Sequence, residues 1–199
     1  MKLTIVGASG HGRVIADIAK LNGYKQIEFL DDNEKLTHCG KYPVVGKTEN
    51  AFSIKNDVFV GIGNSLIRKR FIEQIDDKFL VTLIHPDSVI SDDVIIGKGS
   101  VVMAGTVINS GVEIGKGVIV NTCASVDHDC RIGNFVHVSV GSHLCGTVNV
   151  CELTWIGAGA IVSNNITICS NCMIGAGAVV IKDIIKEGTY VGIPAKIIM

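Results

Sequence analysis

A six-residue repeat runs without interruption from residue 84 to residue 185. Every sixth residue from Ile84 to Val180 is aliphatic, and the seventeen repeats contain no insertion. The residue four places after each aliphatic position is small or branched, from Ser88 to Ile184. A short, fixed period of this kind is the signature of a solenoid, and a period of six residues indicates a parallel β-helix.

The geometry of a strand explains this period. Residues two apart on a strand point to the same side, so the small position and the next aliphatic position both face inward. The residue between them faces outward, and the remaining three form a corner. Three repeats complete one turn of a triangular prism, which predicts nearly six coils stacked about 4.8 Å apart. Seventeen buried aliphatic side chains at roughly 1.5–3 kcal/mol each contribute tens of kcal/mol before chain entropy is subtracted.

Glycine or asparagine often occupies the first residue of a corner. We expect a positive φ there, because these residues tolerate the left-handed region. The positions concerned are Gly97, Asn109, Gly115, Asn121, Gly133, Gly157 and Gly175.

Composition supports this class and excludes others. Hydrophobic residues make up 47% of the chain, aromatic residues only 5%, and 23 residues are glycine, which is typical of a β solenoid rather than a helical bundle. The 18 Lys and Arg against 19 Asp and Glu leave no basic patch for nucleic acid. No apolar run approaches the roughly 18 residues of a membrane span, and no signal peptide is present, so we expect a cytoplasmic protein.

The seven cysteines suggest no disulfide framework. Cys169 and Cys172 form a single CxxC motif. A metal site would require a second pair of ligands, and we therefore expect no metal there.

Residues 1–83 form a separate unit in this interpretation, a small Rossmann-like α/β domain, and residues 84–199 form the β-helix with a C-terminal tail. Strands are expected at 3–6, 27–30, 58–63 and 80–84, and a helix at about 65–74. A further helix follows the first strand and ends at Asn22-Gly23. Its buried side should carry Val14, Ile15, Ile18, Ala19 and Leu21. This alternation is the βαβ pattern of a parallel sheet.

The glycine-rich segment Gly7-Ala8-Ser9-Gly10-His11-Gly12 follows the first strand and opens that helix. N–H groups at a helix start can bind an anion such as a diphosphate. The spacing is G-x-x-G-x-G rather than the G-x-G-x-x-G of dinucleotide sites, which disfavours NAD. A purely structural glycine turn is the alternative.

The repeat array, the 7–12 segment, Val126-Asp127-His128-Asp129-Cys130 and the tail Gly192-Ile193-Pro194-Ala195-Lys196 resemble one family over essentially the whole chain. These features are similar to the sialic-acid O-acetyltransferase-type sugar acyltransferases, which include N-acetyltransferases acting on UDP-4-amino-sugars. The resemblance implies a left-handed β-helix, acetyl-CoA as co-substrate, and a homotrimer with the active site between neighbouring prisms.

His128 is the first candidate for chemistry. It lies at a corner beside Asp129, and a neutral imidazole oriented by a carboxylate can remove a proton from an attacking amine or hydroxyl. The resemblance implies that His128 is the general base and that Asp129 raises its basicity; the nucleotide-sugar N-acetyltransferases carry Glu at that position. A solvated corner histidine is the alternative.

The resemblance also assigns binding residues. It places His137 near the thioester, Gly146 as a backbone donor to the oxyanion, and Ala158 and Ala176 along the pantetheine arm. Ordinary solenoid packing is the alternative for both alanines, and we expect no role for His143. The substrate residues that it implies are Ser9, Gly10, His11, Asp31, Asp32 and Gly63.

These observations predict an acetyl-CoA-dependent sugar acetyltransferase that N-acetylates a UDP-linked 4-amino-sugar. One alternative is O-acetylation of sialic acid or a related sugar, and another is a non-catalytic, nucleotide-sugar-binding trimeric scaffold. A zinc-dependent carbonic anhydrase can share this fold, but its histidine spacing does not match positions 128, 137 and 143. We therefore expect no metal.

Overall fold

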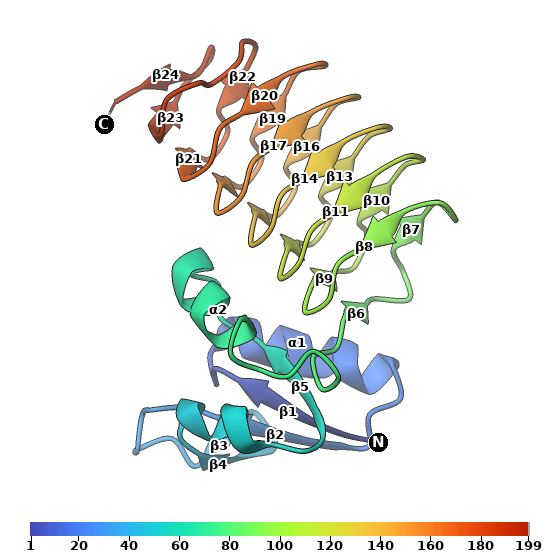
Figure 1. The fold of residues 1–199 in the computed structure, drawn as a ribbon, viewed down its shortest axis with the longest axis vertical. Coiled ribbons are helices and arrows are strands. Elements are labelled where there is room, and N and C mark those ends of the chain that lie inside the picture. Colours follow the sequence, from blue (N-terminus) through green and yellow to red (C-terminus); the bar gives the residue numbers. More distant parts are fainter. Residues whose placement is uncertain (199) are drawn as a thin grey trace. The chain divides into compact units, whose positions relative to one another are not determined.

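A computed structural model describes residues 1–198 of the chain. It contains two compact units, Met1–Pro86 and a second that begins at Asp87 (Figure 1). The predicted fold class is confirmed, because a small α/β sheet is followed by a parallel β-helix. No helix within residues 1–198 has the length and apolar character needed to cross a membrane.

The first unit is built on one five-stranded sheet with the order β3-β4-β2-β1-β5. The strands are β1 (Lys2–Val6), β2 (Gln26–Leu30), β3 (His38–Cys39), β4 (Tyr42–Gly46) and β5 (Asp57–Val60). Only β3 runs antiparallel to its neighbour. The unit also contains α1 (Gly10–Leu21), the 3-10 helix η1 (Thr48–Ser53), α2 (Ser65–Ile72) and β6 (Leu83–Ile84). The sequence prediction missed β3, β4 and η1.

The stripe of buried side chains on helix α1 is narrower than predicted. Ile15, Ile18 and Ala19 are buried as expected. Val14 and Leu21 are 42% and 56% exposed, so their predicted burial was wrong. These two residues are seven apart and therefore share a helix face, and that face lies away from the buried stripe.

The β-helix has three faces, which we number in chain order, and each face is a sheet of mainly parallel strands. Face 1 contains β9 (Val101–Val102), β12 (Ile119–Val120), β15 (His137–Val138), β18 (Trp155–Ile156), β21 (Cys172–Ile174), β23 (Gly188–Val191) and the antiparallel β24 (Lys196–Ile197). Face 2 contains β7 (Val89–Ile90), β10 (Val107–Ile108), β13 (Ser125–Val126), β16 (His143–Leu144), β19 (Ile161–Val162) and β22 (Val179–Val180). Face 3 contains β8 (Ile95–Ile96), β11 (Glu113–Ile114), β14 (Arg131–Ile132), β17 (Asn149–Val150) and β20 (Thr167–Ile168).

Paired strands are 18 residues apart, as in Val107↔Ser125 and Ile108↔Val126. Each coil therefore consists of three repeats, as predicted. The interior is a continuous aliphatic core from Val102 to Ile184. At the small inner position, polar residues bond the next coil: the Ser100 hydroxyl donates to Gly115 O at 2.9 Å and accepts from Val118 N at 2.9 Å.

The prediction of positive φ at the first corner residue was wrong. Left-handed φ values occur at the third corner residue instead, for example at Gly99 (70°), Asp129 (60°) and Asn165 (59°). Glycine at the first position has a different cause, because coils approach closely there. A Cβ on Gly157 would fall 2.5 Å from the carbonyl oxygen of Ile174, which belongs to the backbone of the next coil.

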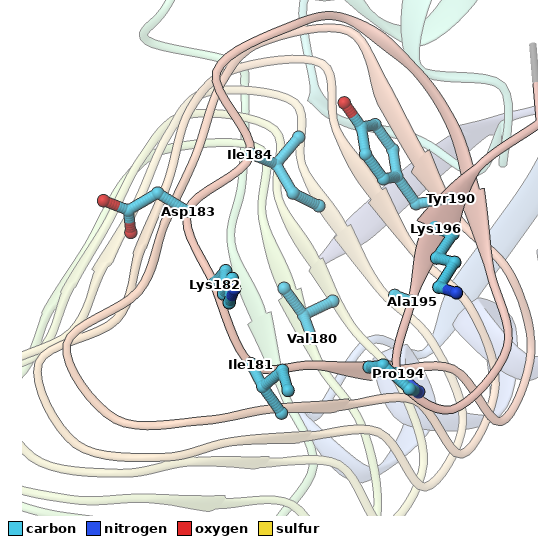
Figure 2. A pocket seen from close by; sticks show the side chains of 9 residues that line it. All are labelled: Val180, Ile181, Lys182, Asp183, Ile184, Tyr190, Pro194, Ala195 and Lys196. Carbon is cyan, nitrogen blue, oxygen red and sulfur yellow. The ribbon is translucent and has the colours of Figure 1, made fainter.

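The last coil has no successor, and the C-terminal tail folds back beside it. A pocket of about 310 Å³ lies between this coil and the tail. Figure 2 shows Val180, Ile184 and Tyr190 pointing into the open end of the prism, while Asp183 points outward. The end of the β-helix is therefore apolar and only partly covered.

Candidate active site

His128 occupies the corner between β13 and β14, with its side chain exposed. Its Nδ1–H donates to Asp129 Oδ2 at 2.8 Å. The shorter Asp therefore makes the orienting hydrogen bond that the motif requires. With the proton held on Nδ1, the neutral imidazole carries its lone pair on Nε2.

Two carboxylates set the charge at this corner. The hydrogen bond to Asp129, followed by the charge of Asp127, raises the pKa of His128. Asp127 Oδ1 also accepts from the backbone N–H of His128 at 2.8 Å and from Asn109 Nδ2 at 2.7 Å. The Asn109 hydrogen bond is the main reason that the pKa of Asp127 is lowered. The corner therefore holds an imidazole whose basicity is raised by the two carboxyl groups beside it.

Gly146 lies at the same corner of the next coil, directly against the imidazole. A Cβ on Gly146 would fall 2.5 Å from His128 Nε2 and 2.7 Å from Cε1. At the matching position one coil earlier, Asp127 accepts the His128 N–H, but Cys145 offers no such acceptor. The Gly146 N–H accordingly donates to no atom of residues 1–198. The structure thus brings together three sequence-predicted residues: His128, Asp129 and Gly146.

His137 lies on a different face of the prism, on β15. Its ring is 5% exposed and packs on Trp155 with the ring centroids 4.3 Å apart. Its Nε2 is 3.1 Å from Asn121 Nδ2 and accepts a hydrogen bond from it. Within one chain, the width of face 2 separates the edge near His137 from the edge that carries His128.

Face 2 itself carries His143. The Nδ1 of His143 lies 2.8 Å from the hydroxyl of Ser125, one coil earlier. The sequence analysis gave no site role to three of these residues, Asn121, Ser125 and Trp155. Their contacts become visible only when residues 16 or 18 apart are stacked in adjacent coils.

Ala158 and Ala176 are exposed at the corner between faces 1 and 2, in adjacent coils. Each precedes a glycine with positive φ, Gly159 at 66° and Gly177 at 67°, around which a Cβ would meet open space. This edge therefore has a strip of small residues that leaves the backbone accessible.

In the first unit, glycines bring the start of α1 close to the end of β1. Gly7 has a φ of 101°, and a Cβ on Gly12 would collide with the carbonyl oxygen of Gly7. Asp31 Oδ2 fixes the loop by accepting from Ala8 N at 2.8 Å. The Ser9 side chain does not cap the helix, so it leaves the N–H groups of the first turn available.

His11 and Gly63 lie near a fully buried cation. Arg68 donates to the carbonyl oxygens of Ile62 at 3.0 Å and Gly63 at 2.7 Å. Burial, and then the charge of Arg68, lowers the pKa of His11 to about 4, so the ring is neutral at physiological pH. Its Nε2 is buried without a hydrogen-bond partner within residues 1–198. Sequence reasoning did not identify Arg68.

Asp32 has a partner within the protein. Its carboxylate accepts from the backbone N–H of Thr48 at 3.0 Å and from the Thr48 hydroxyl at 2.9 Å. Thr48 is buried and begins η1. Asp32 therefore anchors a neighbouring segment, whereas Asp31 supports the glycine loop. Across residues 1–198, no group of three or more His, Cys, Asp or Glu side chains is arranged to hold a metal ion.

Comparisons with known proteins agree with this arrangement. Residues 2–75 match the family model of the PglD N-terminal domain. Over 111 residues, 51% of this chain, the sequence is 37% identical to the UDP-N-acetylbacillosamine N-acetyltransferase of Bacillus subtilis (strain 168). The match spans about half of that curated relative, 51% of its length.

Two solved structures match the chain over almost its full length. The acetyltransferase domain of PglB from Neisseria gonorrhoeae FA1090, in complex with acetyl coenzyme A, is 42% identical with a TM-score of 0.93, covering 99% of this chain and 98% of that one. PerB from Caulobacter crescentus, in complex with CoA and GDP-perosamine, is 34% identical with a TM-score of 0.94, covering 100% of this chain and 98% of that one.

An α/β unit followed by a β-helix with a carboxylate-oriented histidine at its edge is the architecture of hexapeptide-repeat acyltransferases. The sequence identity to the PglB domain and to PerB, and the nearly complete coverage of both chains, identify one family within this class. The chain belongs to the family of bacterial sugar N-acetyltransferases that act on nucleotide-linked amino sugars.

Proposed function

We propose that this protein transfers an acetyl group from acetyl-CoA to the 4-amino group of a UDP-linked amino sugar, with His128 as the general base. The observation that carries the proposal is the hydrogen bond between His128 Nδ1 and Asp129 Oδ2, 2.8 Å long, which leaves Nε2 unprotonated and facing Gly146. UDP is favoured over other nucleotides by the curated Bacillus relative, whose name specifies a UDP-sugar.

The chemistry follows from the charges at this corner. The sugar amine forms a C–N bond to the thioester carbonyl carbon while Nε2 of His128 accepts the amine proton. Asp129 stabilises the imidazolium that results. Collapse of the tetrahedral oxyanion breaks the C–S bond, and His128 returns the proton to the departing CoA thiolate.

Gly146 is suited to the oxyanion. Its N–H has no acceptor within residues 1–198 and lies on a rigid coil, so it can serve as a preorganised donor. The absence of a side chain is required by the imidazole, which fills the space of a Cβ. One residue thus provides both room for the base and a donor for the developing charge.

The small-residue edge at Ala158 and Ala176 is suited to acetyl-CoA. Both alanines are exposed, and open space surrounds the adjacent Gly159 and Gly177. An extended pantetheine arm could approach the backbone there without displacing a side chain. His137 and Trp155, on neighbouring coils of face 1, would form an aromatic wall beside the same edge.

The first unit would bind the nucleotide. The open first turn of α1, held by Asp31 and bordered by the neutral ring of His11, offers N–H donors to a diphosphate. Gly63 has open space around its α-carbon, so a ligand could approach it. Asp32 would act indirectly, through its hydrogen bonds to Thr48.

A homotrimer would complete the active site. His128 and the Ala158–Ala176 edge lie on opposite sides of face 2 in one chain, so a second copy would have to bring its edge to His128. Face 2 exposes apolar side chains suited to such a contact, namely Val89 at 66%, Val107 at 37% and Ile161 at 39%. We further propose that the reaction takes place in the cytoplasm.

A thiol-release assay with acetyl-CoA tests this function. We expect CoA release with a UDP-4-amino-sugar, less with a GDP-4-amino-sugar, and none with UDP-GlcNAc or free sialic acid. His128→Ala should reduce kcat by about 10²–10⁴-fold, whereas Ser110→Ala, one coil earlier at the same corner, should not. Equal turnover by His128→Ala and wild type, or turnover of sialic acid alone, would contradict the proposal.

A further inference from the structure

Two cysteines meet at the corner between β20 and β21, near the C-terminal end of the β-helix. Cys169 follows β20, and Cys172 begins β21. Their Sγ atoms are 3.5 Å apart. Between them, Ser170 and Asn171 form a turn in which Asn171 has a φ of 58°. A four-residue turn holds its two ends within about 7 Å between α-carbons, a separation that a disulfide can span.

The surroundings of the Cys172 thiol differ from those of the equivalent polar side chains in earlier coils. Cys172 occupies the small inner position, where polar side chains bond the next coil. Thr154, one coil earlier, donates to Cys169 O at 3.0 Å and accepts from Cys172 N at 3.2 Å. Cys130 does the same with its thiol, donating to Cys145 O at 3.1 Å and accepting from Val148 N at 3.4 Å.

The coil that follows Cys172 is shorter, because Gly188 rather than residue 190 pairs with Cys172. The Cys172 thiol accepts from the backbone N–H of Gly188 and donates to Lys186 O at 3.7 Å, compared with 3.1 Å for the equivalent bond of Cys130 to Cys145 O. Its Sγ also lies 3.7 Å from Ser170 O. The thiol is therefore held less closely by the next coil than the thiol of Cys130. Its nearest sulfur neighbour is Cys169, which is half-buried, while Cys172 itself is 2% exposed.

We propose that Cys169 and Cys172 are a reversible redox site that a peroxide converts to an intrachain disulfide. Cys169 would react first, because an oxidant can reach it. Cys172 would react second, because it is 2% exposed and its Sγ lies 3.5 Å from that of Cys169.

The reaction balances in two steps. The Cys169 thiol loses its proton and its sulfur attacks one peroxide oxygen; the O–O bond breaks, the departing hydroxide takes that proton, and a sulfenic acid and water form. The Cys172 sulfur then attacks the Cys169 sulfur, so that an S–S bond forms and the S–O bond breaks. The departing hydroxide takes the Cys172 proton and leaves as water. The two thiols together lose two electrons, which the peroxide gains.

The pair lies beneath the tail that closes the β-helix. Cys169 N donates to Ile184 O at 2.8 Å, and Cys172 pairs with Gly188 in β23. Lys186 O accepts the Tyr190 hydroxyl at 2.8 Å as well as the Cys172 thiol. Oxidation removes the thiol proton and with it one contact to this tail, whose Tyr190 lines the pocket in Figure 2.

The test is differential alkylation of the reduced, full-length protein after exposure to hydrogen peroxide. We expect two thiols to become resistant to iodoacetamide, the intact mass to fall by two hydrogens, and fragmentation to place the bond between Cys169 and Cys172. Dithiothreitol should restore both thiols. Cys123→Ser removes an exposed cysteine outside this pair and should leave the reaction unchanged.

Cys169→Ser and Cys172→Ser should each abolish the mass loss, and far-UV circular dichroism would verify that both variants are folded. Cys151 is the competing partner, because it precedes Cys169 by one coil in the same stacked position. A Cys151–Cys169 bond overturns the proposal. So does the survival of both thiols at a peroxide concentration that oxidises Cys123.

Discussion

The imidazole of His128 occupies the space that a side chain on Gly146 would require. A Cβ on Gly146 would lie 2.5 Å from Nε2, the nitrogen left free by the hydrogen bond from Nδ1 to Asp129. Base and proposed oxyanion donor are thus in contact across two adjacent coils. Any change at Gly146 acts on both.

Gly146→Ala should lower the activity of the protein without lowering its stability. The methyl group meets only the exposed ring of His128, so the ring can rotate away while the coil keeps its backbone. We expect kcat to fall by about 10²-fold, the loss typical of an approximately 1 Å displacement of a catalytic group. Ser110→Ala is the matched control at the same corner. A Gly146→Ala protein with wild-type kcat would show that the observed ring position is not the active one.

Asp129→Asn should alter the pH dependence. The base must be neutral, so activity rises as pH increases through the pKa of His128. Asp129 is the main cause of the raised pKa, and its removal should move the acidic limb of kcat/KM to lower pH. The plateau should fall by about tenfold because the imidazole becomes a weaker base.

Asn tolerates the left-handed φ of 60° at position 129, so the fold should be preserved. Asp127→Asn is the comparison, and its smaller contribution predicts a smaller shift in the same direction. An acidic limb that stays in place for both variants would mean that another group controls the profile.

Mixed oligomers should reveal whether two chains share the active site. His128→Ala and Ala176→Trp should each be inactive alone. Co-expressed with different tags and purified as mixed trimers, they should recover about a third of wild-type activity, because one of the three interfaces in each mixed trimer pairs an intact His128 with an intact Ala176. Co-expression of His128→Ala with His128→Asn should recover none. Equal failure of both mixtures would place the whole site within one chain.

Two glycines of one corner should respond differently to substitution. Gly157→Ala places a Cβ 2.5 Å from the backbone oxygen of Ile174 and should cost about 1–3 kcal/mol. Gly159→Asn meets open space at a φ of 66° and should change stability by less than about 0.5 kcal/mol. Urea unfolding monitored by the fluorescence of Trp155, the single tryptophan, measures both. A similar cost for both variants would contradict the close-packing explanation.

Much of the fold could be predicted because its cause is local. An aliphatic residue at every sixth position determines which side chains face inward, and adjacent residues on a strand must alternate. The α/β unit was recognisable from the same kind of pattern, except for the short strands β3 and β4. Their residues lack a clear period, and the two strands are defined by pairing: β4 pairs with β2, and β3 pairs with β4.

The candidate site was predictable only as a set of residues. The motif at 126–130 indicated His128 and Asp129, but their hydrogen bond depends on the left-handed corner at position 129. The corner prediction failed for a related reason. Glycine serves both positive φ and close packing, and the sequence alone does not distinguish these two needs.

By itself, the sequence determined the repeat, the inward register and the family motifs, since each depends on neighbouring residues in the chain. The tertiary structure decided which residues contact each other: Gly146 lies against His128, Trp155 packs on His137, and the thiol of Cys172 lies beside that of Cys169. The first two contacts join residues 18 apart through coil stacking. The third joins two residues of one turn, whose Sγ atoms lie 3.5 Å apart where the next coil is shorter.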